Sequence, residues 1–336
     1  MKRYGGLFDS VISFENLHSA FRLAARGKRE QPEVVRWRYH LETRLLKLRD
    51  RLVAGDYEFG PYRSFMVLDP KPRNIVAAPF EDRIVHHAMC NVLVPVFEKS
   101  FIFDSYACRD GKGTHPAVFR LQEFMRGTPG GHVLQCDVRK YFQSVDHAVL
   151  KRLIRRKVKD CSLLQLVDAV IDSSPVHPDV EPGRGLPIGN LTSQLFANVY
   201  LDPLDHFVKE LLRGQHYVRY VDDWVVVDQD KSRLHEMKGR IGLFLADVLQ
   251  LDLHPNKSHV VPCRSGVTFL GYRVWPNRLR VKTATMVRIR RKEKALRKGY
   301  WQGTVTAEEY RQTVASLLGH IKWGDRTGAV TKQLLS

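Results

Sequence analysis

The chain has 336 residues, 43% of them apolar, and a formal net charge of +18. This is enough apolar sequence for a sizeable core, and no run of about 18 apolar residues is present that would cross a membrane. The N-terminus lacks the apolar segment of a signal peptide, so we expect the protein to remain in the cytoplasm. The five cysteines are widely spaced and odd in number, which argues against a disulfide framework and a structural zinc site. We expect them to be reduced and in or near the core.

The positive charge is concentrated towards the C-terminus. Residues 276–336 contain fourteen Lys or Arg and four Asp or Glu, so fourteen minus four gives +10 of the total of +18. A field of this sign attracts polyanions, of which nucleic acid is the commonest in a cytoplasm. Within this stretch, residues 287–301 mix basic with apolar and aromatic side chains. This pattern favours a helix resting on a phosphate backbone over a basic tail that serves only solubility.

The predicted elements alternate between helices and strands along the chain. Helical periodicity covers residues 14–54 and ends near Gly55, and residues 56–79 are typical of strands broken by turns, one of them at Asp69-Pro70. Further predicted elements are helices over 80–97 and 115–127, a strand over 132–138, and a glycine-containing turn that becomes a helix between 185 and 214. We expect Asn190, Thr192 or Ser193 to cap that last helix.

Two adjacent carboxylates, Asp222 and Asp223, lie in the stretch RYVDDWVVVD, which is typical of a β-hairpin. An isolated Asp-Asp pair would ordinarily be a solvated hairpin tip. A third carboxylate, Asp137, ends the predicted strand 132–138 on its polar face, opposite an apolar face formed by Leu134 and Cys136. If the strand and hairpin share a sheet, only a cation makes three neighbouring anions tolerable. Oxygen ligands indicate Mg²⁺ or Mn²⁺, and a two-metal clamp is the device for in-line phosphoryl transfer.

The order of motifs resembles the palm of reverse transcriptases. Asp137 is followed by Phe142, then GLPIGNLTSQLFAN, YVDD, Lys257 between histidines, and FLGY. The resemblance implies an α/β (α+β) fold of the right-hand polymerase type, with a split β-α-β palm sheet. It also implies three regions: an N-terminal region and fingers over 1–130, a palm over 131–275, and a basic helical thumb over 276–336.

The same resemblance implies roles for individual residues. Asp137, Asp222 and Asp223 would be catalytic, and with Val138 they would hold two Mg²⁺ ions, for which Mn²⁺ can substitute. Phe142 would lie against the sugar and exclude a 2′-hydroxyl, which favours dNTPs; ordinary core packing is the alternative. The implied nucleotide-binding residues are Lys71, Arg73, Phe142, Gly189, Gln194 and Lys257, and the implied primer grip is Phe269, Leu270, Gly271 and Tyr272. Within the first set, Lys71 and Arg73 would grip the triphosphate and Lys257 would protonate pyrophosphate, although each on its own resembles a surface charge.

One motif differs from that of most reverse transcriptases, and this difference resembles a particular subtype. Most reverse transcriptases have Ser-Pro where residues 188–194 have I-G-N-L-T-S-Q, and this pattern resembles the enzymes of diversity-generating retroelements in bacteria and phages. FENLHSAFRLAARGKR, SYACRDGKGTH and GHIKWGD agree with that group. The resemblance implies copying of a template-repeat RNA into cDNA from a primer, with errors opposite adenine set by Arg73, Ile188 and Gln194. It also implies a small basic accessory protein that forms a helical-bundle oligomer.

Two other functions fit the sequence. One is a different bacterial reverse transcriptase, such as a retron, group II intron or phage-defence enzyme, against which Ser193-Gln194 argues. The other is a catalytically idle RNA-binding protein on the same scaffold. Three uncompensated anions facing a polyanion would weaken such a module, so the intact aspartates argue against it. Phe142 disfavours RNA synthesis, which requires a polar partner for the 2′-hydroxyl.

Overall fold

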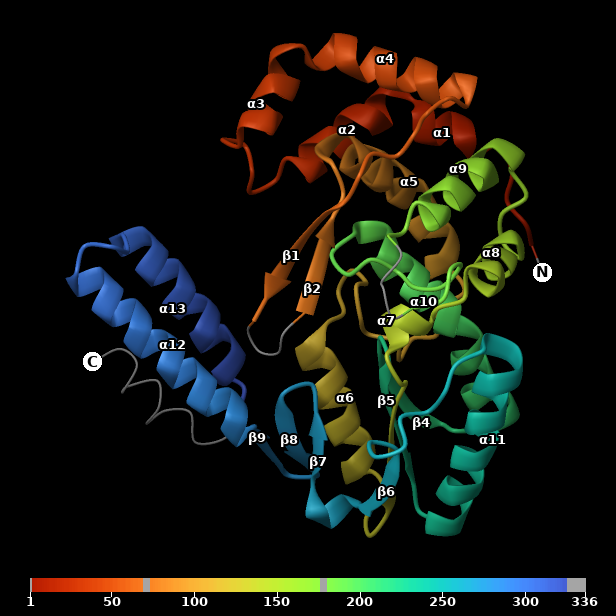
Figure 1. The fold of residues 1–336 in the computed structure, drawn as a ribbon. Coiled ribbons are helices and arrows are strands. Elements are labelled where there is room, and N and C mark those ends of the chain that lie inside the picture. Colours follow the sequence, from red (N-terminus) through yellow and green to blue (C-terminus); the bar gives the residue numbers. More distant parts are fainter. Residues whose placement is uncertain (1, 69–72, 176–179, 325–336) are drawn as a thin grey trace. The chain divides into compact units, whose positions relative to one another are not determined.

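The computed structural model describes residues 2–68, 73–175 and 180–324 and divides the chain into two compact units. Each unit is assembled from three chain segments. The first unit comprises Met1–Phe103, Val138–Phe207 and Ile241–Leu253, and the second comprises Asp104–Asp137, Val208–Arg240 and His254–Ser336. Helices and strands both contribute, as expected for a mixed α/β protein (Figure 1). Among the described residues, no helix is long and apolar enough to span a bilayer.

The N-terminal helices of the first unit pack around one long helix, α5. These elements are α1 (Phe8–Ile12), α2 (Phe14–Ala24), α3 (Pro32–Tyr39), α4 (Leu41–Ala54) and α5 (Phe80–Glu98). The apolar face of α2 buries Leu17 and Phe21, and α2 contacts α5. The predicted helical region 14–54 is confirmed as three helices, because Gly27 has a φ of +72° and Pro32 begins a new helix. The predicted end at Gly55 is confirmed by its left-handed conformation.

Two short strands of the first unit form an antiparallel ribbon (Figure 1). They are β1 (Arg63–Val67) and β2 (Arg73–Ala77), and Arg63 pairs with Ala77. All of β1 is exposed. The predicted turn at Asp69-Pro70 lies outside the described residues.

The remaining helices of the first unit follow Asp137 in the chain. They are α7 (Tyr141–Ser144), α8 (His147–Arg155), α9 (Cys161–Asp172), α10 (Leu191–His206) and residues 241–249 of α11 (Lys231–Leu249). Asp146 caps α8 by accepting a hydrogen bond from Val149 N, and Asp160 caps α9 in the same way. Helix α10 contacts both α5 and α8 and is followed by a π-helical turn, Phe207–Leu211.

A four-stranded antiparallel sheet lies at the centre of the second unit, in the order β4-β5-β3-β6. Its strands are β3 (His132–Asp137), β4 (His216–Tyr220), β5 (Asp223–Asp228) and β6 (His259–Pro262), and helix α6 (Thr114–Arg126) packs against β4 and β5. The predicted polar face of β3 is only partly correct. Val133 belongs to that face but is fully buried, because it packs in the core that includes Leu121 and Met125 of α6.

A second, three-stranded sheet and two helices complete the second unit. They are β7 (Val267–Phe269), β8 (Tyr272–Trp275), β9 (Arg278–Val281), α12 (Thr283–Trp301) and α13 (Ala307–Ile321), and the two helices lie side by side (Figure 1). The predicted basic helix is therefore confirmed as part of α12. All five cysteines are free thiols. Cys108 and Cys161 are exposed, so the expectation that every cysteine lies in or near the core is wrong for these two.

Candidate active site

Antiparallel pairing in the second unit brings the three predicted carboxylates to one end of the sheet. Strands β3 and β5 pair so that Asp137 lies opposite Asp223, the first residue of β5. Tyr220 pairs with Asp223, which leaves Val221 and Asp222 as the hairpin turn. Val221 has a φ of +54°, a left-handed conformation that is strained for a β-branched residue. The turn therefore holds Asp222 at the end of the β4–β5 hairpin at a cost in backbone energy.

The electrostatics of this sheet end are dominated by like charges. The pKa of Asp223 is raised to about 7, first by burial and then by the neighbouring carboxylates of Asp222 and Asp137. Lys257 acts in the opposite direction, because its Nζ lies 2.8 Å from Asp137 Oδ2. The site thus combines mutually repelling acids with the ammonium of Lys257.

Lys257 is placed by the turn that leads into β6. His254 N donates a hydrogen bond to the carbonyl of Asp137 at 2.8 Å, and Lys257 N donates to the carbonyl of His254 at 3.3 Å. Two residues later His259 pairs with Gln135 of β3. The lysine predicted to act on pyrophosphate is therefore anchored to the same strand as Asp137, with its side chain half exposed.

The donor set suits a hard divalent cation. Within residues 2–68, 73–175 and 180–324, no group of three or more His, Cys, Asp or Glu is arranged to hold a metal, and Asp137 is engaged by the ammonium of Lys257. Carboxylate oxygens that repel one another are nevertheless the ligands that Mg²⁺ and Mn²⁺ prefer. Asp137, Asp222 and Asp223 would hold such an ion. Val138 lies in the first unit, where it is buried and bridges to Leu253, and its ligand role stays a prediction.

Arg219 is a site residue that sequence reasoning missed. Its side chain is completely buried in β4, and its Nη1 donates a hydrogen bond to the carbonyl of Val221 at 3.1 Å. Its backbone is fixed as well, because it donates to Asp104 O and accepts from Tyr106 N. Arg219 therefore supports the strained turn from inside. One signal for it was present in the sequence: an arginine lies within a largely apolar predicted strand, two residues before Val221.

The predicted primer grip forms a hairpin between β7 and β8. Phe269 pairs with Tyr272, and the turn residues Leu270 and Gly271 both have positive φ, 48° and 86°. This is the type I′ geometry that suits a two-residue hairpin. Phe269 and Tyr272 belong to the core, and the Tyr272 hydroxyl lies 2.9 Å from Nε2 of His115. Of the four predicted residues, Leu270 and Gly271 retain exposed surface.

A cavity of about 350 Å³ opens beside Lys257 in the second unit. Gln135 forms part of its wall and donates a hydrogen bond to the carbonyl of Thr268 at 2.8 Å, which joins the two sheets. The rest of the wall combines the apolar side chains of Val261 and Val267 with basic and polar ones: Asn256, Lys257, His259, Ser265 and Arg273. Lys257 and Arg273 are the side chains of this wall that suit an anionic group.

Phe142 and its neighbour Tyr141 have different environments in the first unit. Tyr141 is buried, and its hydroxyl donates a hydrogen bond to the carbonyl of Ala197 at 2.7 Å. Phe142 is only half-buried. Tyr141 is therefore the core residue of this short helix, and the role of Phe142 as a sugar gate stays a prediction.

The turn that precedes α10 is tied to two other parts of the first unit. Leu186 N donates a hydrogen bond to the carbonyl of Phe142 at 2.6 Å, and Val76 N of β2 donates to the carbonyl of Ile188 at 3.0 Å. Gly189 has a φ of +125°, and a Cβ there would lie 3.1 Å from Val76 O. Only glycine fits this position without displacing β2. Ile188 and Gly189 thus lie against β2, the strand whose first residue is Arg73.

The start of α10 differs from the prediction. Asn190 occupies the N-cap position but makes no capping hydrogen bond, because its Nδ2 donates to the hydroxyl of Tyr62 at 3.1 Å. Gln194 is exposed on the first turn, while Ser193 is buried. Arg73 is the first residue of β2 and pairs with Val67, whereas Lys71 lies outside the described residues.

Comparison with known proteins identifies the family. Residues 69–274 match the family described as "Reverse transcriptase (RNA-dependent DNA polymerase)". The chain belongs to the reverse transcriptase family and is an RNA-directed DNA polymerase, whose substrates are an RNA template and nucleotides.

Among curated proteins, the chain is similar to Protein YkfC of Escherichia coli (strain K12), with 27% identity over 296 residues, which are 76% of this chain and 77% of that protein. It is also similar to the group II intron-encoded protein LtrA of Lactococcus lactis subsp. cremoris, with 22% identity over 301 residues. That match covers 69% of this chain and 49% of LtrA, so the chain spans about half of that relative. Apo telomerase from Candida tropicalis, truncated from its C-terminal domain, shares the fold with a TM-score of 0.50 and 11% identity over 72% of this chain and 60% of that chain.

Proposed function

We propose that the chain is the reverse transcriptase of a diversity-generating retroelement, which copies a template-repeat RNA into cDNA with frequent errors opposite adenine. The observation that carries this subtype is the stretch Ile188–Gln194, in which Ser-Gln replaces the usual Ser-Pro. Gln194 is exposed on the first turn of α10, directly after a turn that packs on β2. A flexible amide in place of a rigid proline at this point would loosen the hold on the nascent base pair.

The residues of the second unit support metal-assisted phosphoryl transfer. When bound, Mg²⁺ lowers the pKa of the primer 3′-hydroxyl and neutralises negative charge on the triphosphate. The chain contributes Asp137, Asp222 and Asp223 as ligands. Lys257, held 2.8 Å from Asp137, would donate a proton to departing pyrophosphate. The basic helix α12 would hold the template and primer through their phosphates.

A second candidate is a reverse transcriptase of the group II intron type. The similarity to LtrA favours it, since LtrA is a group II intron-encoded protein. The two candidates differ in the error pattern that they predict. A retroelement enzyme misinserts opposite adenine far more than opposite other bases, whereas the second candidate carries no such bias.

Location and partners follow from the subtype. We propose that the protein acts in the cytoplasm of a bacterial host and binds a small basic accessory protein that forms a helical-bundle oligomer. Neighbouring DNA tests this directly. A near-repeat pair that differs mainly at adenines, together with a small basic reading frame, is the expected arrangement.

The biochemical test is single-nucleotide insertion on matched RNA templates that differ only in the templating base. Polymerases discriminate through differential transition-state binding, so loss of about 1.4 kcal/mol raises misinsertion about tenfold. We expect Arg73→Ala and Ile188→Ala to change the ratio of wrong to right insertion most at adenine. Lys257→Ala, the control, should slow all insertions alike. A wild-type error rate that is equal for all four template bases would exclude the subtype while leaving the family unaffected.

A further inference from the structure

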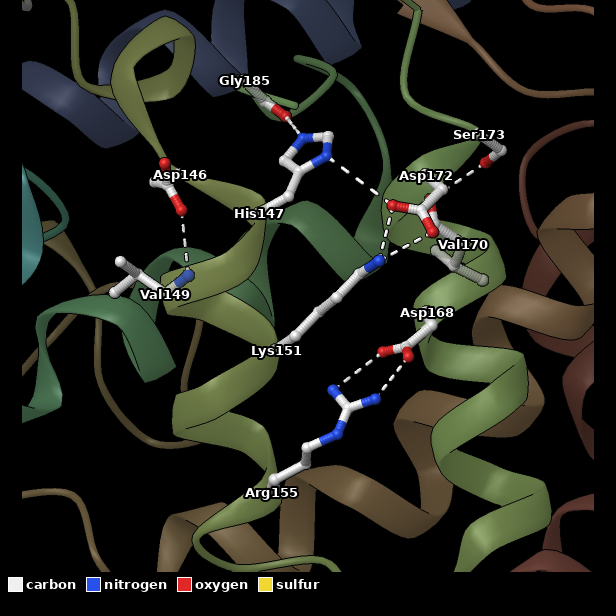
Figure 2. A network of polar contacts seen from close by, with 10 residues as sticks. All are labelled: Asp146, His147, Val149, Lys151, Arg155, Asp168, Val170, Asp172, Ser173 and Gly185. Atoms are coloured by element: carbon white, nitrogen blue, oxygen red, sulfur yellow. Dashed lines mark hydrogen bonds and ion pairs between the residues drawn. The ribbon is translucent and has the colours of Figure 1, made fainter. Parts of the chain in front are cut away.

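Helices α8 and α9 of the first unit are joined by a ladder of polar contacts (Figure 2). At one end Arg155 forms a two-pronged ion pair with Asp168, with Nη1 at 3.1 Å from Oδ1. One turn along, Lys151 Nζ lies 2.6 and 2.7 Å from the two carboxylate oxygens of Asp172. At the far end the ladder reaches His147, the first residue of α8. The ladder is therefore an ordinary helix–helix connection except at this last position.

His147 contacts the turn before α10 through both its backbone and its side chain. Its backbone N donates to the carbonyl of Gly183 at 2.9 Å, and its Nε2 lies 2.8 Å from the carbonyl of Gly185. Because a carbonyl only accepts, Nε2 must carry the hydrogen. Nδ1 lies 3.9 Å from Asp172 Oδ1, beyond hydrogen-bond length but close enough for the carboxylate to orient the ring. The His147 side chain is buried, so water does not readily replace this bond.

The turn held by His147 is intrinsically weakly constrained. Gly183, Gly185 and Gly189 all have positive φ, with values of 79°, 98° and 125°. Glycine at such positions allows the conformation but does not enforce it. Other hydrogen bonds must therefore fix the path of the turn. In its first half these are the two bonds of His147 and the bond from Gly185 N to the carbonyl of Val145.

A shift of this turn would reach both predicted nucleotide-selecting elements of the first unit. On one side, Leu186 N donates to Phe142 O, so the turn and the proposed sugar gate share a hydrogen bond. On the other side, Ile188 O accepts from Val76 N of β2. Gly185 is the residue of the turn that the His147 side chain contacts, and it directly precedes Leu186. Its N–H donates to the carbonyl of Val145.

We propose that His147 is a positioning residue for nucleotide selection. Through its bond to Gly185 it fixes the turn 183–189, and the turn in turn fixes Phe142 and Ile188. Lys151 and Asp172 support it by holding the ring in place. This inference rests on the proposed function and on the predicted role of Phe142, which is to exclude ribonucleotides. His147 itself is not expected to touch the substrate.

The test uses three single variants. His147→Ala removes the side-chain bond to Gly185, whereas His147→Gln retains a donor, because the glutamine amide nitrogen is at the same distance along the side chain as Nε2. Arg155→Ala is the matched control, because it breaks an ion pair between the same two helices without touching the turn. Each purified full-length variant is compared with wild type by primer extension with dNTPs and with rNTPs, and by thermal unfolding.

We expect His147→Ala to raise the KM for dNTPs about tenfold and to reduce the preference for dNTPs over rNTPs about fivefold, the size of effect that loss of one buried hydrogen bond produces. Its kcat should change by less than about twofold. His147→Gln should recover most of both losses. Arg155→Ala should lower the unfolding temperature while leaving KM and sugar preference unchanged. Equal effects of His147→Ala and Arg155→Ala on KM and sugar preference would overturn the proposal.

A second measurement separates this proposal from the proposed function. Hydrogen exchange of the backbone amides of Gly185 and Leu186 reports on the turn in the absence of substrate. We expect faster exchange at both amides in His147→Ala and unchanged exchange in Arg155→Ala. If wild type extends no primer, the proposed function fails, and the exchange rates still decide whether His147 holds the turn. Unchanged exchange in His147→Ala would refute the positioning role whatever the activity.

Discussion

The end of sheet β3–β5 and the turn 183–189 present functional groups in physically different ways. At the sheet end, regular antiparallel pairing sets Asp137 opposite Asp223, and a two-residue turn adds Asp222. In the turn, a short backbone bridge joins Arg184 to Asp146. Beyond it, position depends on separate hydrogen bonds with Phe142, the His147 side chain and Val76. The first arrangement follows from strand register, while the second depends on side chains and strands far away in sequence.

This difference predicts how each region responds to change. A ladder of backbone hydrogen bonds holds its geometry when one side chain is removed, so variants at the sheet end should affect chemistry and leave the fold intact. The glycine-rich turn has a short backbone bridge to Asp146 but no such extended ladder among the described residues. Loss of one contact there should alter selectivity and substrate binding before it alters the chemical step.

The largest effect should come from Asp222→Ala. Removing one proposed metal ligand should reduce primer extension at least about a thousandfold, equivalent to about 4 kcal/mol of transition-state stabilisation, because the remaining carboxylates cannot replace it. RNA affinity should change little, since the basic helix α12 is a separate part of the second unit. Gel-based extension and filter binding measure the two quantities.

Asp228→Asn is the matched control for that variant. Asp228 is the last residue of β5, the strand that follows Asp222, and its carboxylate pairs with Arg233 at the end away from Asp137. It should retain nearly full activity. Extension that survives in Asp222→Ala would remove Asp222 from the site.

The next effect should come from Gly189→Ala. A methyl group there would lie 3.1 Å from both Val76 O and a side-chain carbon of Ile75, at a φ of +125° that non-glycine residues rarely adopt. We expect the turn to shift and the dNTP efficiency kcat/KM to fall about a hundredfold, mainly through KM, for a strain of about 1–3 kcal/mol. Steady-state kinetics measure this.

Gly239→Ala provides the contrast in the second unit. Gly239 lies inside α11, and a Cβ there meets no atom within 4 Å. This substitution should stabilise the helix by about 1 kcal/mol and leave kinetics unchanged. If Gly189→Ala, like Gly239→Ala, leaves kcat/KM unchanged, the contacts of Gly189 with β2 do not control nucleotide binding.

The sequence predicted the regular elements well, because periodicity and turn chemistry are local. The hairpin around Asp222, the strand ending at Asp137 and the helix stop at Gly55 were all predicted from neighbouring residues. Convergence of the carboxylates at one sheet end required only the assumption that the strand and hairpin share a sheet, which the observed register fulfils.

Other features had no local signal. His147 is separated from Gly185 by 38 residues and Asn190 from Tyr62 by 128, so neither contact follows from a local pattern. Asn190, one of the three predicted caps, does occupy the N-cap position of α10, but it makes no capping hydrogen bond and its side chain instead donates to the distant hydroxyl of Tyr62. The burial of Val133 likewise depends on a helix that packs on the sheet.

An effect of intermediate size is expected in the core of the first unit, where the free energy of unfolding should depend on pH through one buried histidine. His86 of α5 is buried, and burial, followed by the charges of His87 and Arg83, lowers its pKa from 6.5 to about 3. Because the folded-state pKa is lowered, the stabilisation is complete above pH 6.5 and is lost as pH falls, when the unfolded chain takes up a proton. Between pH 7 and 5 the loss from this residue should be about 2 kcal/mol.

His86→Phe should remove that part of the pH dependence. Neither ring nitrogen of His86 has a hydrogen-bond partner among the described residues, and the ring stacks on Phe59 with 5.9 Å between the ring centroids. An aromatic replacement therefore loses no hydrogen bond. Urea unfolding of both proteins at pH 7 and pH 5 provides the comparison. Equal losses in wild type and variant would show that His86 does not titrate as its burial requires.

The smallest expected effect is the most specific test of the first unit. Phe142→Ala should lower the preference for dNTPs over rNTPs about tenfold, or about 1.4 kcal/mol, with little change in dNTP use, because the ring is proposed to exclude a 2′-hydroxyl. Tyr141→Phe is the control, since it removes the hydrogen bond to Ala197 O from the adjacent core residue. It should cost about 1 kcal/mol of stability without altering sugar preference. If Tyr141→Phe changes sugar preference as much as Phe142→Ala does, selectivity depends on the packing of α7 as a whole, and Phe142 loses its separate role.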